Sequence, residues 1–170
     1  IVTLEHYKKN GIAHRCFLLN PNPAADAVVI IAKEVDPIII TRHLDPQLFE
    51  LNKQGYLNGH TPFSAYLAFL SILCCVLFDS SLVAVSNEKS SNEGNVRYKG
   101  FEINHQYSKS FDFEKNFNMY LKQYLCTTIS YFSFMRPLGE IQIARLFTQY
   151  KNYFGAFKSC NVNKGLGWCG

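Results

Sequence analysis

The densest group of side chains that could do chemistry lies at residues 104–110. These seven positions hold amides, an imidazole, hydroxyls and an ammonium, in the order Asn-His-Gln-Tyr-Ser-Lys-Ser. Ser110 is a favoured helix N-cap, and Asp112 and Glu114 follow as first-turn acids of a helix predicted to run to about Leu125. A single histidine or lysine is more often structural or solvated. This density directly before a helix start predicts an anion-binding site, because helix N-termini favour anions.

A second polar run, residues 86–95, follows a buried strand predicted at residues 82–85. In open α/β sheets, ligands bind beyond the carboxyl ends of the strands, where loops and helix N-termini converge. The run is rich in Ser, Asn and Glu, and on composition alone it could equally be a solvated loop. The nearby run at residues 104–110 favours the binding interpretation.

Helices and strands alternate among the elements that must position these two runs. Capping and apolar patterns predict helices at residues 1–10, 22–33, 45–55 and 61–79, and a last helix after Pro137. Short apolar runs predict strands at residues 15–19, 37–41 and 82–85. Residues 97–103 alternate around Gly100, as a small hairpin does.

This alternation predicts a doubly wound α/β fold, whose mostly parallel sheet is covered by helices on both faces. At 170 residues the chain suits one domain and is too short for two comfortable ones. We therefore expect a single domain, in which residues 1–95 form the sheet core and residues 96–170 form a hairpin and a helical part. The apolar stretch at residues 62–78 falls short of the roughly 20 residues of a membrane span, so we predict a buried helix and no membrane association.

Composition excludes some classes of protein. Hydrophobic residues make up 48% and charged residues 18%, which is typical of a globular chain and not of a disordered or coiled-coil one. The net charge of +4 suits a phosphate-bearing ligand as well as nucleic acid. The six cysteines lack the dense spacing of small secreted domains, which favours a reducing compartment. Cys16, Cys74 and Cys75 lie in apolar runs and are predicted to be buried free thiols without a chemical role.

Four stretches carry a resemblance to a known family. They are NEKSSNEGN at residues 87–95, NHQYSKS at 104–110, SFMRPL at 133–138 and Cys-Asn at 160–161. In this order they resemble the UDP-N-acetyl-muramoyl-L-alanyl-L-glutamate epimerases, which are similar to ATP-pyrophosphatases of the PP-loop superfamily. The resemblance covers nearly the whole chain, and its two long motifs are the specific ones.

The resemblance implies a cytoplasmic enzyme that uses ATP and Mg²⁺ on a UDP-linked muramoyl dipeptide in peptidoglycan precursor synthesis. Such an enzyme activates the terminal L-glutamate as an acyl-adenylate, releases pyrophosphate, inverts the α-carbon and hydrolyses the adenylate to AMP. Activation helps because a mixed anhydride lacks the carboxylate charge that resists loss of the α-proton. No nucleic-acid partner is implied, and the sequence does not indicate an oligomeric state.

The chain departs from the family pattern at both ends. The family has a Gly-rich loop ending in Lys-Asp-Ser before the helix at residues 1–10, and the amides of such a loop hold pyrophosphate. The chain instead starts with Ile1 inside that helix, so we expect both ends to be interruptions of a longer chain and the activity to need the full-length protein. The family pattern also adds cysteines beyond Cys169. Cys160 and Cys169 alone cannot close a tetrahedral zinc site, so no bound metal is expected there.

The implied chemistry needs cations near the phosphates and a base near the α-carbon. Lys109 and Arg136 are the cation candidates, although Arg136 could equally be a structural residue at a helix entrance. His105 is the first candidate for the base, because its ordinary pKa of about 6.5 lies near working pH; Glu88 is the second. The side chains expected to position phosphate, ribose or peptide by hydrogen bonds are Asn87, Asn95, Asn104 and Ser108.

Two other functions compete with this interpretation. One is a different ATP-pyrophosphatase, which adenylates a nucleobase or tRNA. The other is a non-catalytic RNA-binding module, but the sequence offers few clustered Lys and Arg residues and no RNA-binding motif, which argues against it.

Overall fold

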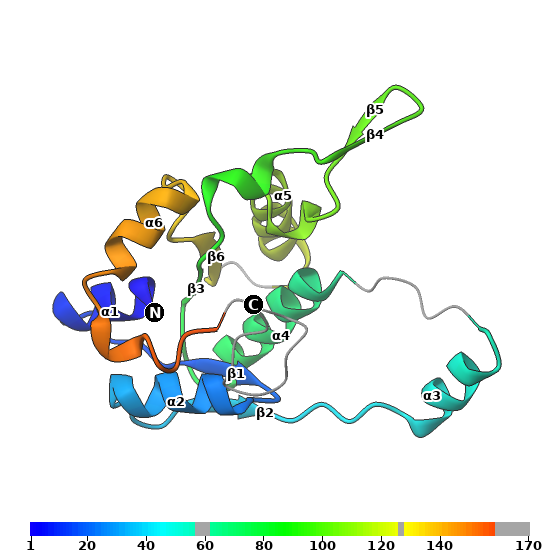
Figure 1. Ribbon diagram of the computed structural model, residues 1–170. Coiled ribbons are helices and arrows are strands. Elements are labelled where there is room, and N and C mark those ends of the chain that lie inside the picture. Colours follow the sequence, from blue (N-terminus) through cyan, green and yellow to red (C-terminus); the bar gives the residue numbers. More distant parts are fainter. Residues whose placement is uncertain (57–61, 126–127, 159–170) are drawn as a thin grey trace. The chain divides into compact units, whose positions relative to one another are not determined.

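The computed structural model describes residues 1–56, 62–125 and 128–158, and its contacts divide the chain into two compact units (Figure 1). The first unit contains the described residues up to Tyr56, except Val2, together with those from Tyr150 onward. The second contains Val2 and the described residues between Pro62 and Gln149. Thr61, Cys160, Asn161 and Cys169, which entered the sequence predictions, lie outside the described residues.

The first unit is built around a short pair of parallel strands. Its helices are α1 (Val2–Lys9), α2 (Pro23–Ala32), α3 (Pro46–Lys53) and the 3-10 turn η4 (Lys151–Tyr153), and its strands are β1 (Phe17–Leu19) and β2 (Ile38–Ile40). Phe17 pairs with Ile38 and Leu19 with Ile40, and α2 connects the two strands, as the predicted alternation requires.

The helix starts in this unit follow the predicted capping chemistry. The side chain of Asn22 accepts a hydrogen bond from the backbone N–H of Ala25 at 2.9 Å, and that of Asp45 accepts one from Gln47 at 2.9 Å. Each cap precedes a proline at the first helical position, where the missing N–H costs nothing. Both predicted helix starts are confirmed.

The second unit contains most of the chain's elements. Its helices are α4 (Phe63–Leu77), η1 (Lys89–Asn92), η2 (Tyr107–Lys109), α5 (Phe111–Tyr120), the π-helical turn η3 (Leu121–Leu125) and α6 (Glu140–Phe147). Its strands are β3 (Leu82–Val85), β4 (Val96–Tyr98), β5 (Phe101–Ile103) and β6 (Ser130–Ser133). Its core consists of side chains from α4, α5, η3 and β6 and the residue before β6: Ala68, Ile72, Cys75, Phe117, Leu121, Ile129 and Tyr131.

The strand β6 is absent from the sequence-based prediction. It pairs in parallel with β3, so that Leu82 lies opposite Ser130 and Val85 opposite Ser133. Its Ser-Tyr-Phe-Ser sequence is short and begins and ends with polar residues, so it lacks the apolar run by which a buried strand is recognised. The helix predicted to run to about Leu125 has the expected extent, because α5 ends at Tyr120 and the chain continues as the π-helical turn η3 to Leu125.

The predicted hairpin is confirmed as the antiparallel pair of β4 and β5, in which Tyr98 lies opposite Phe101. Its two-residue turn has φ of 49° at Lys99 and 85° at Gly100. Positive φ at both positions defines the type I′ turn, whose twist matches that of the flanking strands and which commonly has glycine at its second position.

The free cysteines agree largely with the sequence. Cys74 and Cys75 are buried, whereas Cys16 is half-buried. Burial, reinforced by the neighbouring Glu34 carboxylate, raises the pKa of the Cys16 thiol to about 11, which disfavours the reactive thiolate.

Within the described residues, no helix is long and apolar enough to cross a membrane. The parallel pairs β1–β2 and β3–β6 agree with the predicted strand direction. The wider doubly wound sheet and the single domain stay predictions.

Candidate functional site

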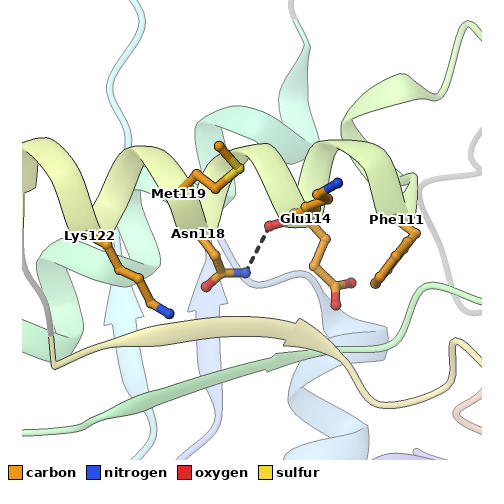
Figure 2. A pocket seen from close by; sticks show the side chains of 6 residues that line it. Phe111, Glu114, Asn118, Met119 and Lys122 are labelled. Atoms are coloured by element: carbon orange, nitrogen blue, oxygen red, sulfur yellow. Dashed lines mark hydrogen bonds between the residues drawn. The ribbon is translucent and has the colours of Figure 1, made fainter.

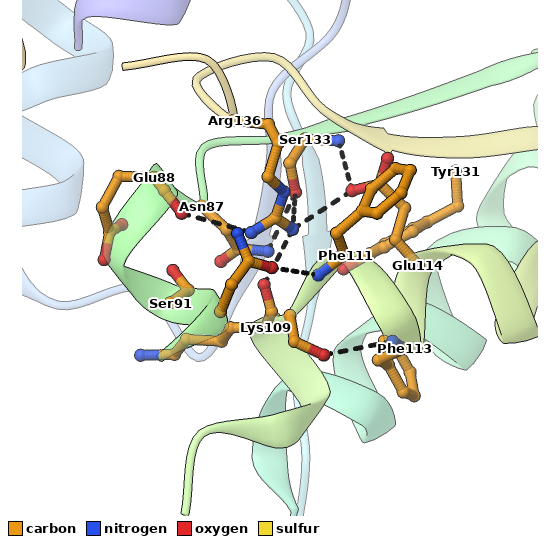
Figure 3. A network of polar contacts seen from close by, with 12 residues as sticks. Asn87, Glu88, Ser91, Lys109, Phe111, Phe113, Glu114, Tyr131, Ser133 and Arg136 are labelled. Atoms are coloured by element: carbon orange, nitrogen blue, oxygen red, sulfur yellow. Dashed lines mark hydrogen bonds and ion pairs between the residues drawn. The ribbon is translucent and has the colours of Figure 1, made fainter. Parts of the chain in front are cut away.

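The guanidinium of Arg136 joins the two polar runs of the second unit (Figure 3). Its Nη1 donates a hydrogen bond to the backbone carbonyl of Glu88 at 3.2 Å, and its Nη2 donates one to the carbonyl of Lys109 at 2.8 Å. Nη2 also lies 3.2 Å from Glu114 Oε2 and 3.0 Å from Ser133 Oγ. A side chain from the turn after β6 therefore holds the loop after β3 and the segment before α5 at one place.

Glu114 is the buried counter-charge of Arg136. Its carboxylate oxygen Oε2 accepts both the Arg136 bond and a 3.1 Å bond from the backbone N–H of Ser133. A buried carboxylate without such partners would be strongly destabilising. From the sequence, Glu114 was expected only to be an acid in the first turn of the helix. Its spacing to Phe117 and Leu121 on one helical face could have marked it as a buried acid that needs a cation.

The amide of Asn118 attaches α5 to β6. Its Oδ1 accepts the backbone N–H of Tyr131 at 2.9 Å, and its Nδ2 donates to the carbonyl of Tyr131 at 2.6 Å. Ser130 and Phe134 donate their backbone N–H groups to carbonyls of the β3 segment, so Tyr131 and Ser133 direct theirs to the opposite side. Side chains of α5 thus form hydrogen bonds with the backbone groups on the edge of β6 that does not face β3. Figure 2 shows Glu114 and Asn118 on the side of the helix that faces this strand.

Asn87 and Tyr131 extend the network behind Arg136. Asn87 Nδ2 donates to Ser133 Oγ at 3.1 Å. Burial, assisted by the negative charge of Glu114, raises the pKa of Tyr131 to about 12, while Arg136 and a hydrogen bond with Asn87 act in the opposite direction. Tyr131 is 3% exposed, so its phenol stays neutral at physiological pH.

Asparagine side chains connect the two polar runs to each other. Asn104 Oδ1 accepts the backbone N–H of Gln106 at 2.8 Å, and Asn104 Nδ2 donates to the carbonyl of Ser91 at 2.8 Å. Asn95 Oδ1 accepts the backbone N–H of His105 at 3.1 Å. The two polar runs therefore lie side by side.

Two side chains accept hydrogen bonds from backbone N–H groups at the N-terminus of α5. Asn92 Oδ1 accepts the N–H of Phe111 at 2.6 Å, and Ser110 Oγ accepts the N–H of Phe113 at 3.1 Å. Because these two donors are already used, helix amides alone are a weaker anion site than the sequence pattern suggested. Anion binding here would depend mainly on cationic side chains.

The remaining predicted residues lie around this network. His105 is exposed, and Ser108 is half-buried on η2. The ammonium of Lys109 donates to Gln106 Oε1 at 2.9 Å. The carboxylate of Glu88 accepts a hydrogen bond from Ser90 Oγ at 3.2 Å. These contacts leave the predicted catalytic roles as hypotheses.

Two cavities border α5 in the second unit. The larger, of about 570 Å³, is lined by Asn92, Asn104, Tyr107, Ser110, Phe111, Asp112 and Arg136. The smaller, of about 290 Å³, follows one side of the helix and is lined by Phe111, Glu114, Lys115, Asn118, Met119 and Lys122 (Figure 2). The larger cavity contains two predicted site residues and is the better candidate for a ligand.

Arg136 lines the larger cavity, and its buried Nε, like the buried Oγ of Ser91, has no hydrogen-bond partner among the described residues. Both residues bind the carbonyl of Glu88, through Arg136 Nη1 and the backbone N–H of Ser91. Buried polar atoms normally have a partner. Unused hydrogen-bonding capacity at this position suits a polar ligand.

Comparison with known proteins assigns the chain to a family. Residues 1–134 match the family described as the MurL N-terminal domain. The chain belongs to this family. No solved structure matches the chain.

Curated relatives support the MurL assignment. The chain is 38% identical to a protein from Micromonospora sp. and 36% identical to one from Salinispora tropica, each over 162 residues that cover 95% of this chain. A third, from Xanthomonas oryzae pv. oryzae, is 38% identical over 138 residues, or 77% of this chain. All three carry the name UDP-N-acetyl-alpha-D-muramoyl-L-alanyl-L-glutamate epimerase. The matched regions span 36%, 35% and 31% of these relatives, about a third of their length.

Proposed function

We propose that the full-length MurL protein containing this chain inverts the terminal L-glutamate of UDP-N-acetyl-muramoyl-L-alanyl-L-glutamate, in the cytoplasm. The observation that carries this proposal is the match of nearly the whole chain to relatives that bear this name. The polar network around Arg136 supports the proposal, because Arg136 binds one backbone carbonyl in each of the two motifs on which the resemblance rests.

We further propose that the reaction proceeds through an acyl-adenylate. The glutamate carboxylate attacks the α-phosphate of ATP, and pyrophosphate leaves. The adenylate then makes the α-proton acidic enough for a positioned base to remove. Reprotonation on the opposite face and hydrolysis of the anhydride give the D-glutamyl product and AMP.

The contacts suggest a division of roles between the two cations. The charge of Arg136 is balanced by Glu114, so we assign Arg136 to hold the loops in position. Lys109 has a neutral partner, Gln106, and keeps a net positive charge that can stabilise phosphate. His105 remains our candidate for the base, since its backbone is anchored to Asn95 while its side chain is exposed.

The proposed reaction uses ATP as its magnesium complex. The described residues hold no group of three or more His, Cys, Asp or Glu residues that could bind a metal ion. Mg²⁺ commonly binds through substrate phosphates and one or two carboxylates, so we expect it to arrive with ATP. We also propose a PP-loop-type doubly wound fold, in which a Gly-rich loop supplies the remaining phosphate contacts.

The experiment that tests the proposal uses the full-length protein with ATP, Mg²⁺ and the UDP-linked L-Ala-L-Glu dipeptide. We expect AMP and pyrophosphate only when the dipeptide is present, and D-glutamate in the hydrolysed product. The matched control is UDP-N-acetyl-muramoyl-L-alanine, which lacks the glutamate and should release neither. ATP turnover that responds to tRNA instead would contradict the proposal.

A further inference from the structure

The β4–β5 hairpin carries an apolar face that is largely exposed. Val96 lies opposite Ile103, and Tyr98 lies opposite Phe101. Since alternate residues of a strand share a face, these four side chains lie on one side of the hairpin. Their exposed fractions are 50%, 42%, 61% and 72%, respectively. A contiguous apolar patch exposed in this way is typical of a binding surface.

The hairpin is fixed at both ends. Its type I′ turn defines its tip, and Asn95 donates its backbone N–H to the carbonyl of Ile103 at 3.0 Å at its base. Asn95 also accepts the N–H of His105, and Glu102 Oε1 accepts the N–H of Gly94 at 3.1 Å. The hairpin thus extends directly from the two motifs of the candidate site, and it projects away from α5 (Figure 1).

A cation accompanies the aromatic side chains. The ammonium of Lys99 lies over the ring of Tyr98, 5.4 Å from its centroid. Aromatic side chains stack on nucleobases, and a neighbouring ammonium attracts the attached phosphates. The intervening pair Arg97 and Glu102 points to the opposite face of the hairpin.

We propose that Tyr98 and Phe101, with Lys99, bind the uridine diphosphate part of the substrate. This inference rests on the proposed function, in which the substrate has glutamate at one end and UDP at the other. The candidate site at the hairpin base receives the reacting end, and the nucleotide lies along the hairpin face. A second protein copy is a poorer occupant, because a stable interface buries roughly 1,000 Å² or more and this face offers only four side chains.

The test measures the binding of free UDP to the full-length protein by calorimetry. A non-hydrolysable ATP analogue is present at saturation, so that UDP does not bind in the ATP site. Tyr98→Ala and Phe101→Ala should each weaken UDP binding by about 5- to 100-fold, the loss expected for one stacked base. Tyr98→Phe, which keeps the ring, should restore most of the affinity. Arg97→Gln, on the opposite face, is the matched control and should leave the affinity unchanged.

The outcomes separate this proposal from the proposed function. UDP binding does not need epimerisation, so absent AMP release together with the expected losses would refute the reaction and keep the UDP site. Unchanged UDP affinity in both alanine variants, or no UDP binding by the unmodified protein, would refute the UDP site. An equal loss in Arg97→Gln would also contradict it. Unchanged UDP affinity with an altered oligomeric state on gel filtration would assign this face to a protein partner.

Discussion

The Arg136 guanidinium is mostly buried, and both of its terminal nitrogens donate to acceptors of the protein. A phosphate-binding arginine normally offers a pair of donors to its ligand, and here those donors hold the carbonyls of Glu88 and Lys109. Of the two interpretations left open by the sequence, the contacts therefore favour the structural one. The phosphate-binding role then passes to Lys109 among the predicted cations.

The proposed role of the single residue His105 as the base can be tested separately from adenylation. His105→Gln should leave dipeptide-dependent pyrophosphate release largely intact, because adenylation does not need removal of the α-proton. In deuterium oxide, the variant should release AMP with little deuterium at the glutamyl α-carbon, whereas the unmodified enzyme should incorporate it. Mass spectrometry of the product measures the exchange.

Two results would contradict the assignment of His105 as the base. Normal exchange in the variant would exclude His105 as an essential base. Equal loss of pyrophosphate release and exchange would indicate that His105 binds substrate or holds its loop, and Glu88 would become the candidate for the base.

Tyr131 gives the free energy of unfolding a predictable pH dependence. Its folded-state pKa is raised from 10.0 to about 12, so the unfolded chain loses the phenolic proton first as pH rises above 10. The stabilisation is therefore fully present below pH 10 and is lost between about pH 10 and 12. Urea unfolding of the full-length protein at pH 9, 10 and 11 should show the advantage over Tyr131→Phe shrinking with pH. Parallel pH profiles of the two proteins would contradict the assigned pKa.

At the scale of elements, α5 acts as a substitute for a neighbouring strand. Glu114 and Asn118, four residues apart, lie on the same side of the helix. Together they bind the outward-facing backbone groups of Ser133 and Tyr131. This arrangement protects the outer edge of β6, which would otherwise be available for pairing with another chain. It also fixes the helix start that follows the residues 104–110.

The amide of Asn118 provides a test of this contact between α5 and β6. Asn118→Ala should lower the free energy of unfolding of the full-length protein by about 1–3 kcal/mol, because the backbone N–H and carbonyl of Tyr131 lose their partner. Asn116→Ala on the same helix, where Asn116 is exposed and bonds only near the surface, is the matched control and should stay within about 0.5 kcal/mol. Urea denaturation measures both. Equal effects of the two substitutions would contradict the edge-covering role.

At the scale of the whole molecule, the predicted site residues all belong to the second unit. The polar runs at residues 87–95 and 104–110 and the Arg136 segment lie within residues 62–149. The first unit contributes the β1–α2–β2 arrangement and none of these side chains. Among the described residues, the polar network around Arg136 is therefore built from side chains and backbone groups of the second unit.

The local structure could be predicted from the sequence, because capping and turn chemistry act between residues close in the chain. Asn22, Asp45 and Ser110 cap the helices that their types predicted, and Lys99 with Gly100 forms the predicted hairpin turn. The sequence also determined the family, through long motifs whose order is itself informative.

Which side chains meet depends on long-range packing and could not be predicted from the sequence. The pairing of β6 with β3 and the burial of Glu114 against Arg136 join residues far apart in the chain, and no local pattern encodes such contacts. The same packing brought Asn92 to the N-terminus of α5, where it accepts the N–H of Phe111 and so occupies an amide that the sequence had offered to an anion. Local rules identify donors and acceptors, whereas long-range packing determines which of them remain available to a ligand.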